Sequence, residues 1–161
     1  MHSRSFKPGH AQRGVAMVEF AITLPLLLLL LLAIAEVGRM LYHYNNLLQA
    51  SRDAVRYVAD RAWNNQLDKF ELDPAVEAER MNLEATKNLA VYGVPASQPG
   101  NEVVPGLTTS NVTVSTVGSD HVQVSINYVF QPVIGNSLPA LIGDAIPLNI
   151  PLVATSVMRG L

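Results

Sequence analysis

The sequence predicts an α+β protein in which a long N-terminal helix carries a small head with an antiparallel sheet. Three patterns predict it. An apolar run covers residues 15–35, a helical spacing of apolar side chains follows it, and the C-terminal half alternates apolar and polar residues. The chain has 161 residues, so its length suits one modest domain attached to the apolar run.

The composition excludes several protein classes. Hydrophobic residues make up 49% of the chain, which excludes an intrinsically disordered protein, and the lack of cysteine excludes a disulfide framework. One apolar run is too few for a multi-spanning channel. The 11 basic residues are balanced by 13 acidic ones, so the charge gives no indication of nucleic-acid binding.

A basic leader and a membrane-length helix are predicted at the N-terminus. Residues 1–14 carry Arg4, Lys7 and Arg13 and no acidic residue. Residues 15–35 would span ~32 Å as a helix, enough for a bilayer core of ~30 Å. Because basic flanks stay on the cytoplasmic side, we expect residues 36–161 to lie outside.

One acidic residue, Glu19, interrupts the apolar run. An ionised carboxylate inside a membrane is costly unless it is paired or lies near the interface. A span that began after it, at residues 20–35, would measure only ~24 Å, which is short for a bilayer. The presence of Glu19 is therefore not explained if the segment is only a membrane anchor.

The sequence Gly-Val-Ala-Met-Val-Glu-Phe at residues 14–20 resembles the cleavage signature of type IV prepilin-like proteins. Pro25 before a leucine run, followed by Glu-Val-Gly-Arg at residues 36–39, resembles the TadE-like pseudopilins of the tight-adherence (Tad/Flp) pilus system. The resemblance implies that a prepilin peptidase cuts between Gly14 and Val15. Glu19 would then be the fifth residue of the mature chain and pair with the new amino terminus of a neighbouring subunit.

The resemblance also implies a function, partners and a location. It implies a structural minor pseudopilin that assembles or initiates an adhesive Tad-type pilus, with Phe20 and the leucine run packing helix against helix. The implied partners are prepilin peptidase, the inner-membrane assembly platform, other pilins or pseudopilins, and the membrane. The implied location is the bacterial inner membrane, single-pass with a periplasmic head, or the pilus itself.

Two other interpretations use the same residues. Ala-Ile-Ala at residues 33–35 fits a secretory signal peptide, and cleavage after Ala35 would release a soluble binding or adhesion module. Against it, the run over residues 20–35 exceeds the ~7–15 residues of such signals, and Glu19 remains unexplained. The third interpretation is an uncleaved single-pass anchor.

The first helix is expected to continue into the head. Its apolar residues recur every three or four positions, which predicts an amphipathic helix over residues 36–63 continuous with the membrane segment. Pro25 is the expected kink, because proline lacks an N–H and clashes with the preceding turn. The expected core stripe comprises Val37, Met40, Leu41, Tyr44, Leu47, Leu48, Ser51, Val55, Val58, Ala59 and Ala62.

The remaining elements follow from turn and capping residues. Asp73 and Pro74 predict the N-cap and first residue of a second helix over residues 73–91, which ends at Gly93. A loop is expected over residues 93–106. Strands are expected over residues 111–117, 121–130 and 148–157, the first two as a hairpin; Pro147 and Pro151 place the start of the third at a sheet edge.

The sequence gives no indication of catalysis, a metal or a cofactor. Neither His43 nor His121 has a partner at metal-ligand spacing, and no nucleophile motif or glycine-rich phosphate loop is present. Glu77, Glu79 and Glu84 fit a solvated helix face. We therefore expect a structural protein without catalytic residues.

Overall fold

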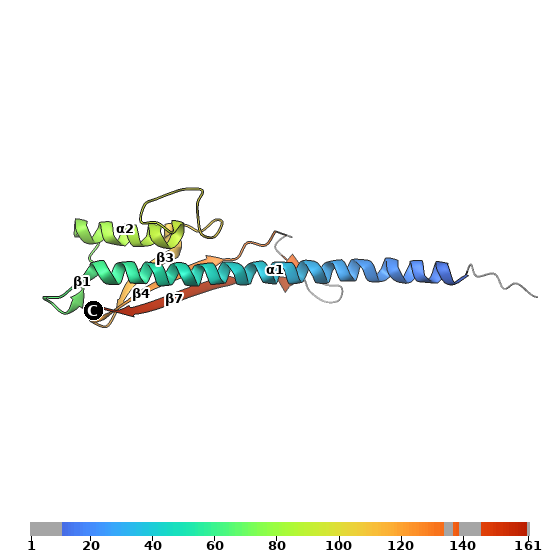
Figure 1. Ribbon diagram of the computed structural model, residues 1–161, viewed down its shortest axis with the longest axis horizontal. Coiled ribbons are helices and arrows are strands. Elements are labelled where there is room, and N and C mark those ends of the chain that lie inside the picture. The colour runs from blue at the N-terminus through green and yellow to red at the C-terminus, as the bar shows by residue number, and fades with distance from the viewer. Residues whose placement is uncertain (1–10, 134–136, 139–145, 161) are drawn as a thin grey trace, which may run out of the picture. The chain divides into compact units, whose positions relative to one another are not determined.

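The computed structural model describes residues 11–133, 137–138 and 146–160. The chain forms two compact units, residues 1–38 and residues 39–161. One helix, α1 (Ala11–Ala62), begins in the first unit and ends in the second, without interruption at Pro25 or Gly38 (Figure 1). This confirms the continuous helix expected from the sequence, and the kink at Pro25 stays a prediction.

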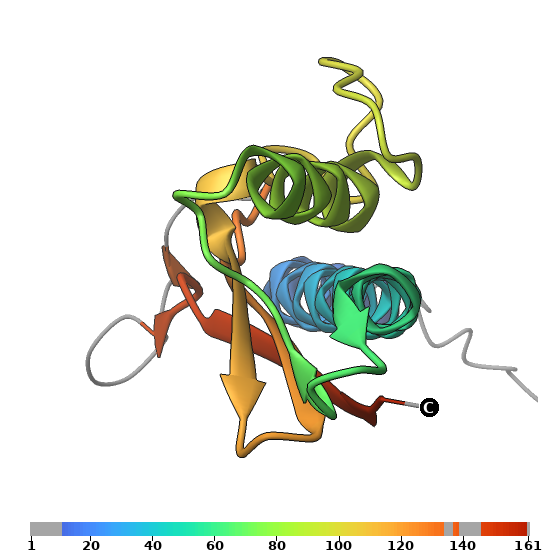
Figure 2. The ribbon, with the colours of Figure 1, turned by 90° about the vertical axis from the view of Figure 1, so that its left-hand side faces the viewer.

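The second unit is the head, and its core is shared by α1, a second helix and a three-stranded sheet. In Figure 2 the head part of α1 lies between the second helix, α2 (Glu77–Tyr92), and strand β7 (Pro151–Arg159). Buried apolar residues of α1 recur at helical spacing, and four of the seven are alanines that let neighbouring elements approach closely. They are Leu47, Ala50, Ala54, Val55, Val58, Ala59 and Ala62.

The stripe predicted on this helix is wrong at its N-terminal end. Val37 and Leu41 are 48% and 54% exposed, whereas His43 is buried and the alanines at 50 and 54 join the core. The reason is helical phase: His43 lies four residues before Leu47 and therefore on the buried face, while Leu41 lies six residues before it and points elsewhere. Hydrophobicity alone does not distinguish these positions.

The main sheet is antiparallel and has the order β3-β4-β7, with β4 in the centre. Strands β3 (Val112–Val117) and β4 (His121–Val129) form the predicted hairpin, which turns at Gly118 with φ +71°. The predicted alternation on β4 is confirmed, since its even-numbered residues are buried: Val122, Val124, Ile126 and Tyr128. Phe130, predicted inside this strand, follows its end and is also buried.

The third strand begins later than predicted, at Pro151 rather than residue 148, and extends to Arg159. It pairs with β4 alone and is therefore an edge strand, as the two prolines indicated. Proline is tolerated there because an edge strand needs ladder donors on one side only.

The predicted start of the second helix is wrong by three residues, because its first helical residue is Glu77 and not Pro74. Asp73 caps no helix: its Oδ1 accepts a hydrogen bond from the Ala75 N–H at 2.9 Å and so forms a local turn. Helix α2 begins at Glu77 after Val76, whose backbone is extended and whose side chain makes no capping bond. The predicted end is confirmed, with Gly93 left-handed at φ +72° and its N–H bonded to the Leu89 carbonyl.

Two short strand pairs and one turn of 3-10 helix were not predicted. Strands β1 (Trp63–Asn64) and β2 (Lys69–Phe70) pair with each other, as do β5 (Ser137–Leu138) and β6 (Ile146–Pro147). The 3-10 turn, η1 (Thr109–Asn111), precedes β3. Two-residue ladders are too short to produce an alternating sequence pattern.

Gly160, the last residue that the structure describes, lies against the start of β1. The Gly160 N–H bonds to the Asp120 carbonyl at 2.9 Å, and the Trp63 ring lies directly on Gly160. Trp63 in turn meets Phe70 edge-to-face, with centroids 4.9 Å apart. The Asp120 carboxylate pairs with Arg159 at 3.1 Å, and its hydrogen bond with His121 holds the pKa of this carboxyl below its ordinary value.

Candidate functional site

The N-terminal part of α1 presents its apolar side chains outward. From Gly14 to Ala35 every residue except Leu29 and Ala33 is exposed. The most apolar window has a mean hydropathy of 2.6 and none of it is buried, and this is the one helix among the described residues that is long and apolar enough to cross a membrane. A helix of this composition fits an apolar surrounding such as a membrane.

The predicted processing residues Gly14 and Val15 lie on the first turns of α1, and both are exposed. A Cβ added at Gly14 would meet no atom within 4 Å. Glycine inside a helix costs about 1 kcal/mol relative to alanine. Packing among the described residues therefore gives no reason for a glycine at this position.

Glu19 and Phe20 lie one turn further along α1 and are also exposed. Val15 and Glu19 are four residues apart, so the structure brings them onto one face of the helix, ~6 Å apart along its axis. Both side chains are exposed in the part of the chain that the structure describes. Glu19 is therefore accessible to a second helix.

Thr23 is a feature of this segment that the sequence analysis missed. Its hydroxyl donates to the Glu19 carbonyl at 3.0 Å and lies 3.3 Å from the Phe20 carbonyl. Such bonds compete with the helical ladder, and Pro25 two residues later supplies no N–H for the Ala21 carbonyl. Within the continuous helix, only the Ala21 carbonyl therefore lacks its i+4 N–H donor because of Pro25. The sequence signal for the hydroxyl bond is the spacing: Thr23 lies four residues after Glu19, and a threonine hydroxyl in a helix can bond the carbonyl four residues earlier.

Residues 14–56 match the family model of TadE-like proteins. The TadE-like match begins at the predicted cleavage residue and includes Glu19, Phe20 and Pro25. It ends within α1, before the sheet. The resemblance seen in the sequence is therefore confirmed, and the match is consistent with a TadE-like component of the Tad pilus. No curated protein and no solved structure matches the chain.

Of the three acidic residues predicted on a solvated helix face, Glu77 and Glu84 are exposed, whereas Glu79 is half-buried and accepts a hydrogen bond from the Asp73 N–H. Arg80 of α2 lies 3.3 Å from Glu84 and 4.0 Å from Glu77. Within the described ranges, no group of three histidine, aspartate or glutamate residues could hold a metal ion. Residues 1–10 of the predicted basic leader lie outside the described residues.

Proposed function

We propose that this chain is a minor pseudopilin, anchored by the N-terminal part of α1, that takes part in assembling or initiating a Tad-type pilus. The observation that supports the proposal most strongly is that one helix, α1, has two properties at once. It exposes an apolar surface from Gly14 to Ala35, and it is the part of the chain that matches TadE-like proteins. The role is structural, and no catalytic residue is invoked.

In this proposal, maturation begins with removal of residues 1–14. The basic leader holds the N-terminus in the cytoplasm and leaves the head in the periplasm, with the anchor in the inner membrane. Prepilin peptidase then cuts after Gly14, whose missing side chain lets an extended backbone enter a narrow cleft. The cut removes the leader's positive charge and creates an ammonium group at Val15.

The new ammonium group and Glu19 supply the recognition chemistry. In a low-dielectric surrounding the two charges attract strongly, and each offsets the other's desolvation. The accessible Glu19 of one subunit pairs with Val15 of the next and sets the register of neighbouring helices. Phe20 and the leucine run then pack between helices. The partners are other pilins or pseudopilins and the inner-membrane assembly platform.

A deletion and complementation experiment tests the proposal. Removing the protein from its host is expected to lower the number of surface pili, counted by electron microscopy, at least tenfold, and the full chain is expected to restore it. A chain with Leu28→Arg and Leu31→Arg is expected to fail, because each arginine costs about 3 kcal/mol at the centre of a membrane helix.

The matched control carries isoleucine at positions 28 and 31 and is expected to restore pili. Normal piliation of the deletion strain would contradict the proposal. Full rescue by the arginine variant would contradict it too, because it would show that membrane anchoring is dispensable, as expected of a secreted module.

A further inference from the structure

One edge of the main sheet is left open by the head. Strand β7 pairs with β4, and no other strand among the described residues pairs with its opposite edge. Residues 152–158 contain neither a charge nor a proline. Edge strands are usually protected by charged residues, prolines or a covering element, because their free N–H and C=O groups accept another strand. Here Pro151 and Arg159 protect only the ends.

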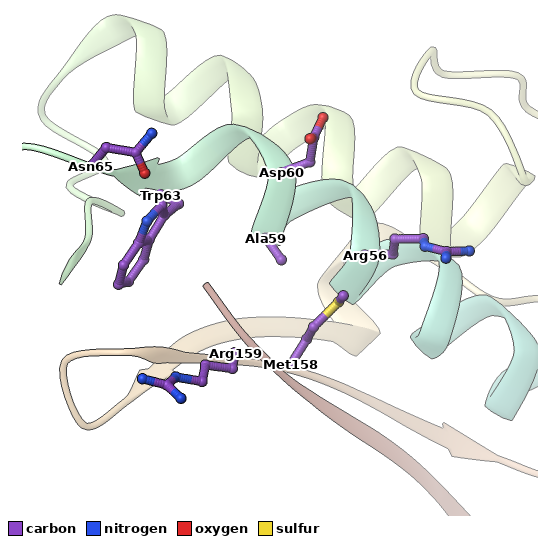
Figure 3. A pocket seen from close by; sticks show the side chains of 7 residues that line it. All are labelled: Arg56, Ala59, Asp60, Trp63, Asn65, Met158 and Arg159. Carbon is purple, nitrogen blue, oxygen red and sulfur yellow. The ribbon is translucent and has the colours of Figure 1, made fainter. Parts of the chain in front are cut away.

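A groove runs between this strand and helix α1. Two hollows of about 400 and 520 Å³ share Arg56 and Met158, so they form one continuous feature. The hollow in Figure 3 has an apolar floor, made by Ala59 and Met158 facing each other and closed at one end by Trp63. The other hollow extends along α1 to Gln49. An extended segment bound to the strand would occupy this groove.

The α1 wall of the groove carries two arginines, Arg52 and Arg56, and two aspartates, Asp53 and Asp60. Both arginines are exposed and make no ion pair within the described part of the chain. Asp60 pairs with Arg61 at 3.5 Å, whereas Asp53 accepts only from the neutral Gln49 amide at 3.1 Å and keeps its charge, so two arginine charges stand against one aspartate charge. The groove therefore favours a ligand that brings carboxylates to the two arginines.

We infer that this groove binds an extended segment of another protein, which adds a strand to the free edge of β7. Main-chain hydrogen bonds to the strand would provide affinity. Carboxylates on one face of the segment would meet Arg52 and Arg56, and an apolar side chain would enter the hollow beside Trp63. The inference concerns the head alone and does not depend on cleavage after Gly14.

A second copy of this chain fits the groove less well. In a two-fold arrangement the two β7 strands would pair antiparallel about their midpoint, Thr155. The Ser51 hydroxyl lies 2.8 Å from that of Ser156, which places α1 close to this midpoint. The arginines at positions 52 and 56 of both copies would then face one another, and like charges at close range repel. The charge therefore favours a different, acidic partner.

Binding of two synthetic peptides to the full chain in detergent micelles tests the inference. One peptide alternates valine and glutamate over eight residues, and the other alternates valine and lysine; both are acetylated and amidated. We expect the glutamate peptide to bind at least tenfold more tightly and to slow hydrogen exchange of β7 amides. Changing both Arg52→Glu and Arg56→Glu is expected to weaken it at least tenfold.

Lys69→Glu is the control. Lys69 is also an exposed cation of the head without an ion pair in the described part of the chain, but it lies on β2 and lines neither hollow, so we expect less than a twofold change. Equal binding of both peptides would overturn the inference, as would binding that the double variant leaves unchanged. Self-association of the full chain that is abolished by Val157→Lys would overturn it as well, because the edge would then serve a second copy.

Discussion

Replacing Glu19 by alanine is expected to lower the number of assembled pili at least tenfold while cleavage after Gly14 continues. The side chain is exposed, so we expect its loss to leave the fold intact. In the proposed assembly, what is lost is the partner for the ammonium group of a neighbouring subunit, a pairing that is strong where water is excluded. Electron microscopy measures the pili, and mass spectrometry of the membrane-bound chain measures cleavage.

Two further variants make the Glu19 experiment specific. Glu19→Gln keeps the size but removes the charge, so it is expected to behave like the alanine variant. Thr23→Ala is the matched control in the same stretch of helix, because its hydroxyl bonds only to the helix's own carbonyls, and it is expected to assemble normally. Wild-type pilus numbers in the Glu19→Ala strain would contradict the proposal that Glu19 sets the register of neighbouring helices.

Replacing Gly160 by alanine is expected to destabilise the head by about 2 kcal/mol. The new Cβ would lie 2.1 Å from Cε3 of Trp63, so the indole ring has to leave its place. Its displacement also breaks the edge-to-face contact with Phe70, which is worth about 1 kcal/mol. For a unit of this size we expect the Tm to fall by about 8 °C.

Fluorescence measures this effect directly, because Trp63 is the chain's one tryptophan. Its emission is expected to shift to longer wavelength in Gly160→Ala. Gly38→Ala is the control, since an added Cβ there meets nothing within 4 Å in a helical position, and it is expected to leave Tm unchanged or slightly raised. In a chain that already carries Trp63→Leu, Gly160→Ala is expected to lower the Tm by less than it does in the wild-type chain. An equally large fall in Tm would show that the clash with the indole ring does not cause the destabilisation.

The features that could be predicted from the sequence are those encoded locally. The apolar run and the helical spacing predicted α1, and the alternation of Val122, Val124 and Ile126 around a glycine turn predicted the hairpin. The left-handed residue that ends α2 was predicted because glycine adopts that conformation without a Cβ clash. The exposed apolar segment of α1 was predictable for the same reason, since a run of apolar residues long enough to cross a membrane is visible in the sequence itself.

The features that were missed depend on contacts between distant residues or on competition between local bonds. Asp73 has the side chain of an N-cap, yet it bonds the Ala75 N–H and leaves α2 to begin four residues later. The packing of Trp63 on Gly160 joins residues almost 100 positions apart. The groove beside β7 exists only because α1 and the strand run next to each other, which no local pattern contains.

Determining the N-terminus of the mature protein, purified from its own host, tests the central claim most directly. N-terminal sequencing with intact-mass measurement is expected to show a chain that begins at Val15, and a chain changed at Gly14 is expected to keep its leader. A chain that begins at Glu36 would instead show a signal peptide and a soluble product. An intact leader that is indifferent to Gly14 would show a plain anchor, and either result would contradict the pseudopilin account.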